Sequence, residues 1–298
     1  MGGEIIVLND SQNSYYVLLT LYRDTLGIDI STTQDFAVTD SQGNVVSNLT
    51  STIDSSAIHP IFGTVQGGLI PMFPYGVEIY FYSASINLPN PGEYTVSWES
   101  CCRNEIIGNI SNASSENMSL HTTFTNDVSQ NDSSPYFLVK PVVYLPVNTP
   151  WQYNPLPIDP DGDSLNWFIG TPNNALGTPI PTYVDPPSDP SNVLSMDPVS
   201  GTITWTASVT GNWVYTIVCE EFRGGIKIGE IRRDMQVIVV PSGSLPSFSN
   251  IGTVVPIVGG YPQWSIPAGQ NSELRLLGGN PGTTNSVLFE AYGEPFLS

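Results

Sequence analysis

The sequence predicts an all-β protein made of tandem antiparallel β-sandwich domains. Three observations indicate this class. The apolar runs are short, about 4 to 8 residues, and rich in β-branched and aromatic residues, which is typical of strands. Turn-forming residues separate these runs, and the 298 residues include 27 Gly and 26 Pro. No helix-type periodicity of apolar residues extends along the chain.

The predicted strands follow one another in order, and each is bounded by a turn. The clearest strand-like runs are 15–22, 77–82, 94–98, 142–147, 213–219 and 235–240. Between them lie turn signals rich in Gly, Asn, Asp and Pro, at 41–44, 90–92, 161–163 and 223–225. Many short strands joined by such turns favour sandwiches of antiparallel sheets.

Two polar stretches of small residues divide the chain into three parts. Residues 126–134 (NDVSQNDSS) end at a proline, and residues 241–246 (PSGSLP) form a second linker. We therefore predict an N-terminal β-sandwich domain at 1–134, a second β-sandwich domain at 135–241 and a C-terminal β piece at 242–298. A piece of this size buries too little surface to be robust alone. We expect it to pack on the second domain, to be partial, or to be completed by a strand of another chain.

Charge balance and hydropathy each exclude one class of protein. Acidic residues outnumber basic ones by 27 to 8, and the net charge is −19, although charged residues make up only 12 % of the chain. The acidity therefore comes from a shortage of Lys and Arg, and eight basic residues cannot build a face for nucleic acid. The sequence also lacks the run of about 18 apolar residues that a membrane span requires.

The few basic residues are expected to be structural ties. Arg23 precedes Asp24 at the end of a predicted strand, Arg103 follows two cysteines, and Arg223 follows shortly after Glu220. We expect each guanidinium to hold a loop by bidentate pairing with a carboxylate, such as that of Asp24 or Glu220. A functional anion site is the alternative.

The three cysteines leave the disulfide pattern open. Cys101 and Cys102 are adjacent, so on a strand they point to opposite faces and at most one faces the core. One of them paired with Cys219 would link the first two domains, or all three are small buried hydrophobic side chains. Their number and spacing do not fit a zinc site, and an odd number leaves a free thiol.

An acidic loop is the candidate metal site. Asp159, Asp161 and Asp163 alternate around a Gly turn, and oxygen ligands at alternate positions of a tight loop suit Ca²⁺. The alternative is an Asp-capped β-turn without metal. Candidates for further ligands are Asp127, Asp132 and Glu220.

No catalytic site is evident in the sequence. The two histidines, His59 and His121, belong to no known motif, and the chain has no HExxH, GxSxG or P-loop sequence. We expect a protein that is not an enzyme. Aromatic residues of the second domain are expected to be core, although an exposed pair of rings would indicate a carbohydrate-binding module: Trp151, Tyr153, Trp167, Trp205 and Trp213.

Six motifs occur in a fixed order: Leu21–Asp24, Cys101–Asn104, Ser134–Phe137, Asp159–Leu165, Asp197–Ile203 and Cys219–Gly225. Together they resemble the N-terminal modules of large secreted surface proteins of Bacteroidetes, of the gliding-motility and type IX secretion kind. The resemblance covers about residues 2–240. One departure is Thr25, where the family pattern usually has a Cys, so the partner that the family implies for Cys101 or Cys102 is missing.

The resemblance implies Ig-like, cadherin-like and PKD-like sandwiches in an extracellular, cell-surface location. It also implies calcium at the acidic loop, since similar loops hold Ca²⁺ at junctions of cadherin-like modules. We expect a non-catalytic structural or adhesive protein, such as a filament subunit or an adhesin segment. Its expected partners are other copies of itself, neighbouring surface modules and, for a carbohydrate-binding module, glycans.

Overall fold

The chain folds into sheets. The computed structural model describes residues 2–59, 76–88, 90–127, 132–141 and 144–241, with short pieces between 247 and 279. Within these residues the only helices are two 3-10 turns, η1 (Ala113–Ser115) and η2 (Ala175–Gly177). The predicted all-β class is confirmed. In the same described part of the chain, no helix has the length and hydrophobicity needed to cross a membrane.

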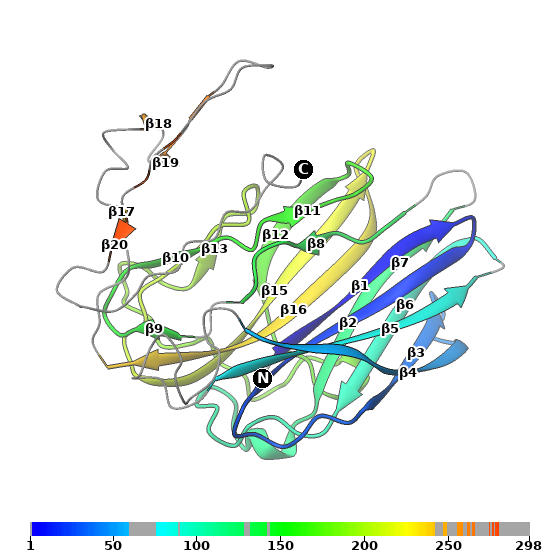
Figure 1. Ribbon diagram of the computed structural model, residues 1–298, viewed down its shortest axis with the longest axis horizontal. Helices are drawn as coiled ribbons and strands as arrows, with labels where there is room; N and C mark the ends of the chain where they lie inside the picture. The colour runs from blue at the N-terminus through cyan, green and yellow to red at the C-terminus, as the bar shows by residue number, and fades with distance from the viewer. Residues whose placement is uncertain are drawn as a thin grey trace.

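The first seven strands belong to one antiparallel sheet (Figure 1). They are β1 (Gly2–Ser11), β2 (Ser14–Asp24), β3 (Thr33–Asp40), β4 (Val45–Ile58), β5 (Val77–Asn87), β6 (Gly92–Ser100) and β7 (Met118–Asn126). Neighbouring strands follow the order β1-β2-β5-β4-β3-β6-β7. Buried and exposed residues alternate along β3 and β6, as expected for strands with one face on a core.

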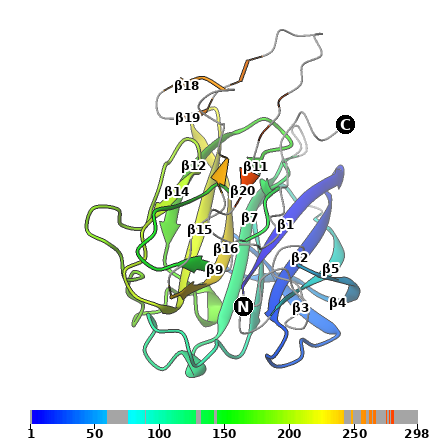
Figure 2. The same cartoon turned by 60° about the vertical axis from the view of Figure 1, so that its left-hand side comes forward.

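A late strand closes this sheet on itself. Along one edge, β16 (Ile226–Val240) pairs first with β7, at residues 230 and 231, and then with β1, at residues 233 and 234, both antiparallel. Its other edge pairs with β15 (Gly211–Arg223). Figure 2 shows β1, β7 and β16 side by side. The hydrogen-bonded path of the first 126 residues is therefore completed by residues that come more than a hundred positions later in the chain.

The same strand also belongs to a second group of elements. Strands β12 (Ser164–Gly170) and β15 (Gly211–Arg223) extend the main sheet beyond β16. A separate small sheet has the order β10-β14-β13, and the remaining pairings involve β8, β11 and β9, of which β9 runs parallel to β16. Their bounds are β8 (Tyr136–Phe137), β9 (Tyr144–Pro146), β10 (Trp151–Tyr153), β11 (Pro157–Ile158), β13 (Ser195–Met196) and β14 (Ile203–Trp205).

Each group of strands has its own hydrophobic core. The first core is formed by residues of β1 to β7, including Tyr15, Phe36 and Phe124. The second lies between the β12-β15-β16 layer and the smaller strands, and it contains the five aromatic residues singled out in the sequence, all less than 10 % exposed: Trp151, Tyr153, Trp167, Trp205 and Trp213. Their interpretation as core is confirmed, so these rings offer no platform for stacking on a sugar.

The predicted C-terminal piece, 242–298, lies for the most part outside the described residues. Four short strands are described there, β17 (Ser247–Phe248), β18 (Ile257–Val258), β19 (Tyr261–Pro262) and β20 (Gly278–Gly279). They pair as β17 with β20 and β18 with β19.

Two buried ion pairs fix β16 to the first part of the chain. Glu4 lies directly opposite Arg233 in the register, and its two carboxylate oxygens accept from Nε and Nη2 of that guanidinium. Arg233 also lies over the Phe137 ring, 4.0 Å from its centroid. The next residue, Asp234, points to the other face of the strand and accepts two hydrogen bonds from Arg103, at 3.1 and 2.8 Å. Both faces of β16 are thus joined to earlier residues.

Removing Arg233 should destabilise the protein strongly. The variant Arg233→Met leaves the Glu4 carboxylate buried without its cation, and we expect a loss of about 3–5 kcal/mol in unfolding free energy, measured by chemical denaturation. The double variant Glu4→Leu with Arg233→Met should lose less, because no buried charge is left unpaired. The control Asp29→Asn removes an acid whose side chain is 98 % exposed, and it should change stability little. An Arg233→Met protein as stable as this control would contradict the role of the pair.

Candidate functional site

The predicted ion pairs between arginines and carboxylates are formed, but two of the arginines have partners other than those expected. Arg23 pairs with Asp29 at 2.7 Å and Glu78 at 2.6 Å, and it donates to the carbonyls of Gly27 and Ile28. The expected pairing with Asp24 is not formed, because adjacent residues of β2 point to opposite faces. The buried Asp24 carboxylate instead accepts from the backbone of its own loop, from the N–H of residue 26 at 3.0 Å.

Arg223 likewise does not pair with Glu220. Its guanidinium binds Asp163 and Asp132, the latter at 3.2 Å. Glu220 accepts instead from Lys227 at 2.8 Å and from Asn166 at 3.1 Å, away from Arg223. A β-bulge between residues 221 and 222 interrupts the register here.

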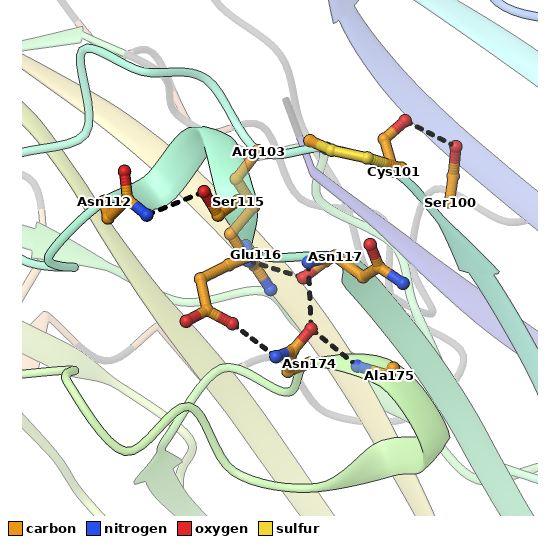
Figure 3. The surroundings of a disulfide bond; sticks show 10 residues. Ser100, Cys101, Arg103, Asn112, Ser115, Glu116, Asn117, Asn174 and Ala175 are labelled. Carbon is orange, nitrogen blue, oxygen red and sulfur yellow. Dashed lines mark hydrogen bonds between the residues drawn. A yellow bond between two sulfur atoms is a disulfide. The ribbon is translucent and has the colours of Figure 1, made fainter.

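The cysteines form one disulfide, between the neighbours Cys101 and Cys102 (Figure 3). Cys219 is a free thiol, fully buried in the second core. The inter-domain link to Cys219 that the sequence left open is therefore not formed, and neither is the alternative of three unpaired cysteines. Cys219 faces the second core from the middle of β15, whereas the disulfide follows the end of β6.

The loop after the disulfide is attached to the second part of the chain. Figure 3 shows Asn174 between Glu116, Asn117 and Ala175. The Oδ1 atom of Asn174 accepts from the backbone N–H groups of Asn117 and Ala175, at 2.9 and 2.8 Å, and its amide nitrogen donates to Glu116. One side chain thus joins the loop after β6 to η2.

Thiol titration tests this cysteine pattern. The native protein should show no reactive thiol, because the described thiol of Cys219 is buried, and burial also raises its pKa far above the ordinary value. One thiol should react after denaturation without reductant, and all three after reduction. Three reactive thiols before reduction would rule out the disulfide.

The acidic loop belongs to a larger group of charges, here named the Arg223 cluster: Asp132, Asp159, Asp161, Asp163, Glu221 and Arg223. The three loop aspartates lie between β11 and β12, Glu221 and Arg223 lie at the end of β15, and Asp132 precedes β8. The cluster therefore contains five carboxylates and one guanidinium, which contacts two of them, Asp132 and Asp163.

The loop itself is an Asp-capped turn. Asp159 Oδ1 accepts from the backbone N–H groups of Asp161 and Asp163, at 2.9 and 2.8 Å, and Gly162 takes the positive φ of 81° that such a turn favours. Asp161 turns away, and its Oδ2 accepts from the N–H of Ser133 at 2.6 Å. The turn predicted as the alternative to a metal loop is thus present, but it uses only one oxygen of Asp159.

Two carboxylates of the cluster have partners of opposite charge. Both oxygens of Asp163 face Arg223, with Nε at 2.9 and 3.1 Å. Asp132 is fully buried and accepts from the N–H of Thr125 at 2.8 Å besides its bond to Arg223. Burial raises the pKa of Asp132 to about 6, although the Thr125 bond and the arginine act in the other direction.

Glu221 is the unusual member of the cluster. Its side chain is fully buried, and neither carboxylate oxygen meets a hydrogen-bond donor; the same holds for Asp159 Oδ2. Burial, together with the nearby aspartates, raises the pKa of Glu221 to about 10. Asp159, Asp163 and Glu221 each offer one oxygen within 4.8 Å of the others, and so do Asp132, Asp161 and Asp163.

The predicted triad of loop aspartates is therefore divided between two groups that share Asp163. Of the proposed further ligands Asp132 lies in the cluster, whereas Asp127 and Glu220 belong to neither group. Glu221 was not among the ligands predicted from the sequence. The sequence did contain a signal for it: Glu221 lies two positions after Cys219 in an apolar strand, and residues two apart on a strand point to the same face.

A half-buried carboxylate, that of Glu230 on β16, has the opposite electrostatics. Lys227 donates to it at 2.7 Å and Arg232 at 2.9 Å, and His121 Nε2 lies 3.7 Å away. Burial alone would raise the pKa of Glu230, but these three donors together keep it well below the ordinary value. The folded state therefore stabilises the ionised form.

The variant Glu230→Gln should lower the unfolding free energy at pH 7 by about 1–3 kcal/mol, because the charged donors lose their anion. The stabilisation by ionised Glu230 is present above the ordinary Glu pKa of about 4.3 and is lost progressively as the pH falls below it. The difference between the wild type and the variant should therefore shrink on acidification, as followed by chemical denaturation from pH 7 to pH 3. Exposed Glu93→Gln supplies the baseline. A difference that grows on acidification would be the contrary result.

Comparison with known proteins assigns the chain to no family, since no family model and no curated protein matches it. Two solved structures are similar to it at a low level, the N-terminal four Ig domains of Dscam1 isoforms 8.4 and 6.44. The sequence identities are 7 % and 6 %, and the TM-scores are 0.19 and 0.18. Each match covers 84 % of this chain and 81 % of the other. At these scores the likeness carries no argument about function.

Proposed function

We propose that the chain is a non-catalytic structural part of an extracellular cell-surface protein, of the modular kind that its motifs resemble in Bacteroidetes. The observation that carries this proposal is the pair of buried salt bridges on the two faces of β16, Glu4 with Arg233 and Arg103 with Asp234. They join the two groups of strands through a shared element, which suits a stiff spacer.

The use of positive charge supports a structural role. Six of the eight basic residues form ion pairs with carboxylates of the same chain: Arg23, Arg103, Arg223, Lys227, Arg232 and Arg233. Scarce cations committed to internal contacts stabilise the fold and leave a negatively charged exterior. Domains that move relative to one another meet in small and polar interfaces. The two groups of strands in this protein are instead joined by a continuous sheet.

The alternative function, a carbohydrate-binding module, gains no support from the five aromatic rings considered for it. It would need exposed rings, and these five are buried. Assembly into a filament by strand addition concerns residues 242–298, which lie for the most part outside the described residues. The structural role is therefore the one proposed.

Calorimetry of the full chain tests whether residues 2–241 form one stiff unit. The two groups of strands share β16, so residues 2–241 should unfold in one cooperative transition whose calorimetric and van't Hoff enthalpies agree for that part of the chain. Circular dichroism in the near ultraviolet and Trp fluorescence should follow the same transition. Two well-separated transitions in residues 2–241 would indicate two domains that unfold independently, and they would overturn the proposal of a stiff unit.

Treatment of intact cells of the source organism with a protease tests the location. The protein should be cleaved while a cytoplasmic marker stays whole, because we propose that it lies outside the cell. Protection of the chain until the cells are lysed would overturn the extracellular assignment.

A further inference from the structure

The buried end of β15 carries an arrangement that the spacer role does not use. Glu221 brings a carboxylate oxygen within 4.8 Å of oxygens of Asp159 and Asp163 in the acidic loop, and its neighbour across the strand pair is Gly229. A Cβ atom at this glycine would lie 2.7 Å from Glu221 Oε2, so only glycine leaves room for the carboxylate. The fold thus makes space for a charged group in a position that most proteins fill with an apolar side chain.

Three oxygens in this space lack a donor. They are Oε1 and Oε2 of Glu221 and Oδ2 of Asp159, each buried. A buried polar atom without a partner costs about 1–3 kcal/mol, and more when it is charged. The cation of this cluster, Arg223, is bound to Asp163 and Asp132. When Glu221 and Asp159 are both ionised, the geometry therefore leaves their negative charge without a cation in contact.

We propose that Asp159, Asp163 and Glu221 bind one divalent cation, Ca²⁺, at this position. One oxygen from each residue lies within 4.8 Å of the other two, which fits ligands around a single ion at about 2.3–2.6 Å. The donor set consists of carboxylate oxygens alone, which selects a hard cation over zinc or copper. An irregular set with a carboxylate free to bind through both oxygens favours Ca²⁺ over Mg²⁺, which requires regular octahedral geometry.

The ligand set differs from the one that the loop spacing predicts. Asp161 is replaced by Glu221, because Asp161 is held by Ser133 on the side of Asp132. The ion would join the loop after β11 to the end of β15, and Asp163 would lie between the ion and Arg223. This site does not depend on where the protein is located or on its role as a spacer.

Equilibrium dialysis of metal-free full-length protein against Ca²⁺ at pH 7 is the direct test. The wild type should bind Ca²⁺ at this site, and saturating Ca²⁺ should raise its melting temperature. Glu221→Gln keeps the shape of the side chain but removes a charged ligand, so it should weaken binding by at least about tenfold. The matched control is Glu220→Gln, one residue away outside both acidic groups, which should bind as the wild type does.

A second variant covers the case in which Glu221→Gln does not fold. Asp159→Asn keeps the oxygen that caps the turn and removes the charge of the unpartnered one, and it should also weaken binding by at least about tenfold. The proposal is overturned if the wild type binds no Ca²⁺, in which case a proton shared by Glu221 and an aspartate neutralises the cluster. It is also overturned if a folded variant binds as tightly as the Glu220→Gln control, because the ion then lies elsewhere. Neither result alters the cooperativity or the location tested above.

Discussion

The salt bridge between Glu4 and Arg233 is the contact on which the rest of the architecture depends. It lies in the step where β16 closes the circuit of the first seven strands, and both side chains are buried. Two charges can be kept there only because the geometry is bidentate and the guanidinium has further partners in Tyr153 and Phe137. The pair therefore fixes the register of β16 as well as its partner, since a slip by one residue would place each charge on the wrong face.

The two clusters of charged residues in this protein stabilise negative charge in different ways. At Glu230 three donors surround one carboxylate, and the ionised form is favoured. In the Arg223 cluster one guanidinium serves several carboxylates, and Glu221 is left without a donor. The shortage of Lys and Arg in the composition is thus also seen locally, in the Arg223 cluster. Acids of this cluster that have no basic partner need a proton or a metal ion to neutralise them.

The sequence predicted the class of the fold because it depends on local signals. Short β-branched runs such as 15–22 form strands, and turn residues such as Gly162 take the positive φ that the turn needs. The pairing of residues far apart in the chain has no such local signal. Nothing local to Arg233 specifies that it lies opposite Glu4, and the adjacency of Arg23 and Asp24 suggested a pair that strand geometry forbids. The same limit applies to the cation site, where the loop spacing identified two of the three proposed ligands and Glu221 comes from a strand 58 to 62 residues further on.

The shared strand has a consequence for how the chain reaches its fold. The partners of the closing salt bridge are separated by 229 positions, so the contact order of this step is high and folding through it is slow. During synthesis, β1 to β7 emerge long before β16, with the edge of β1 and the carboxylate of Glu4 still uncovered. An early chain of this kind is exposed to edge-to-edge association, and it stays incompletely folded until residue 240 has been made. Because the closing strand comes after all the strands that it joins, the chain stays open until the whole unit is available.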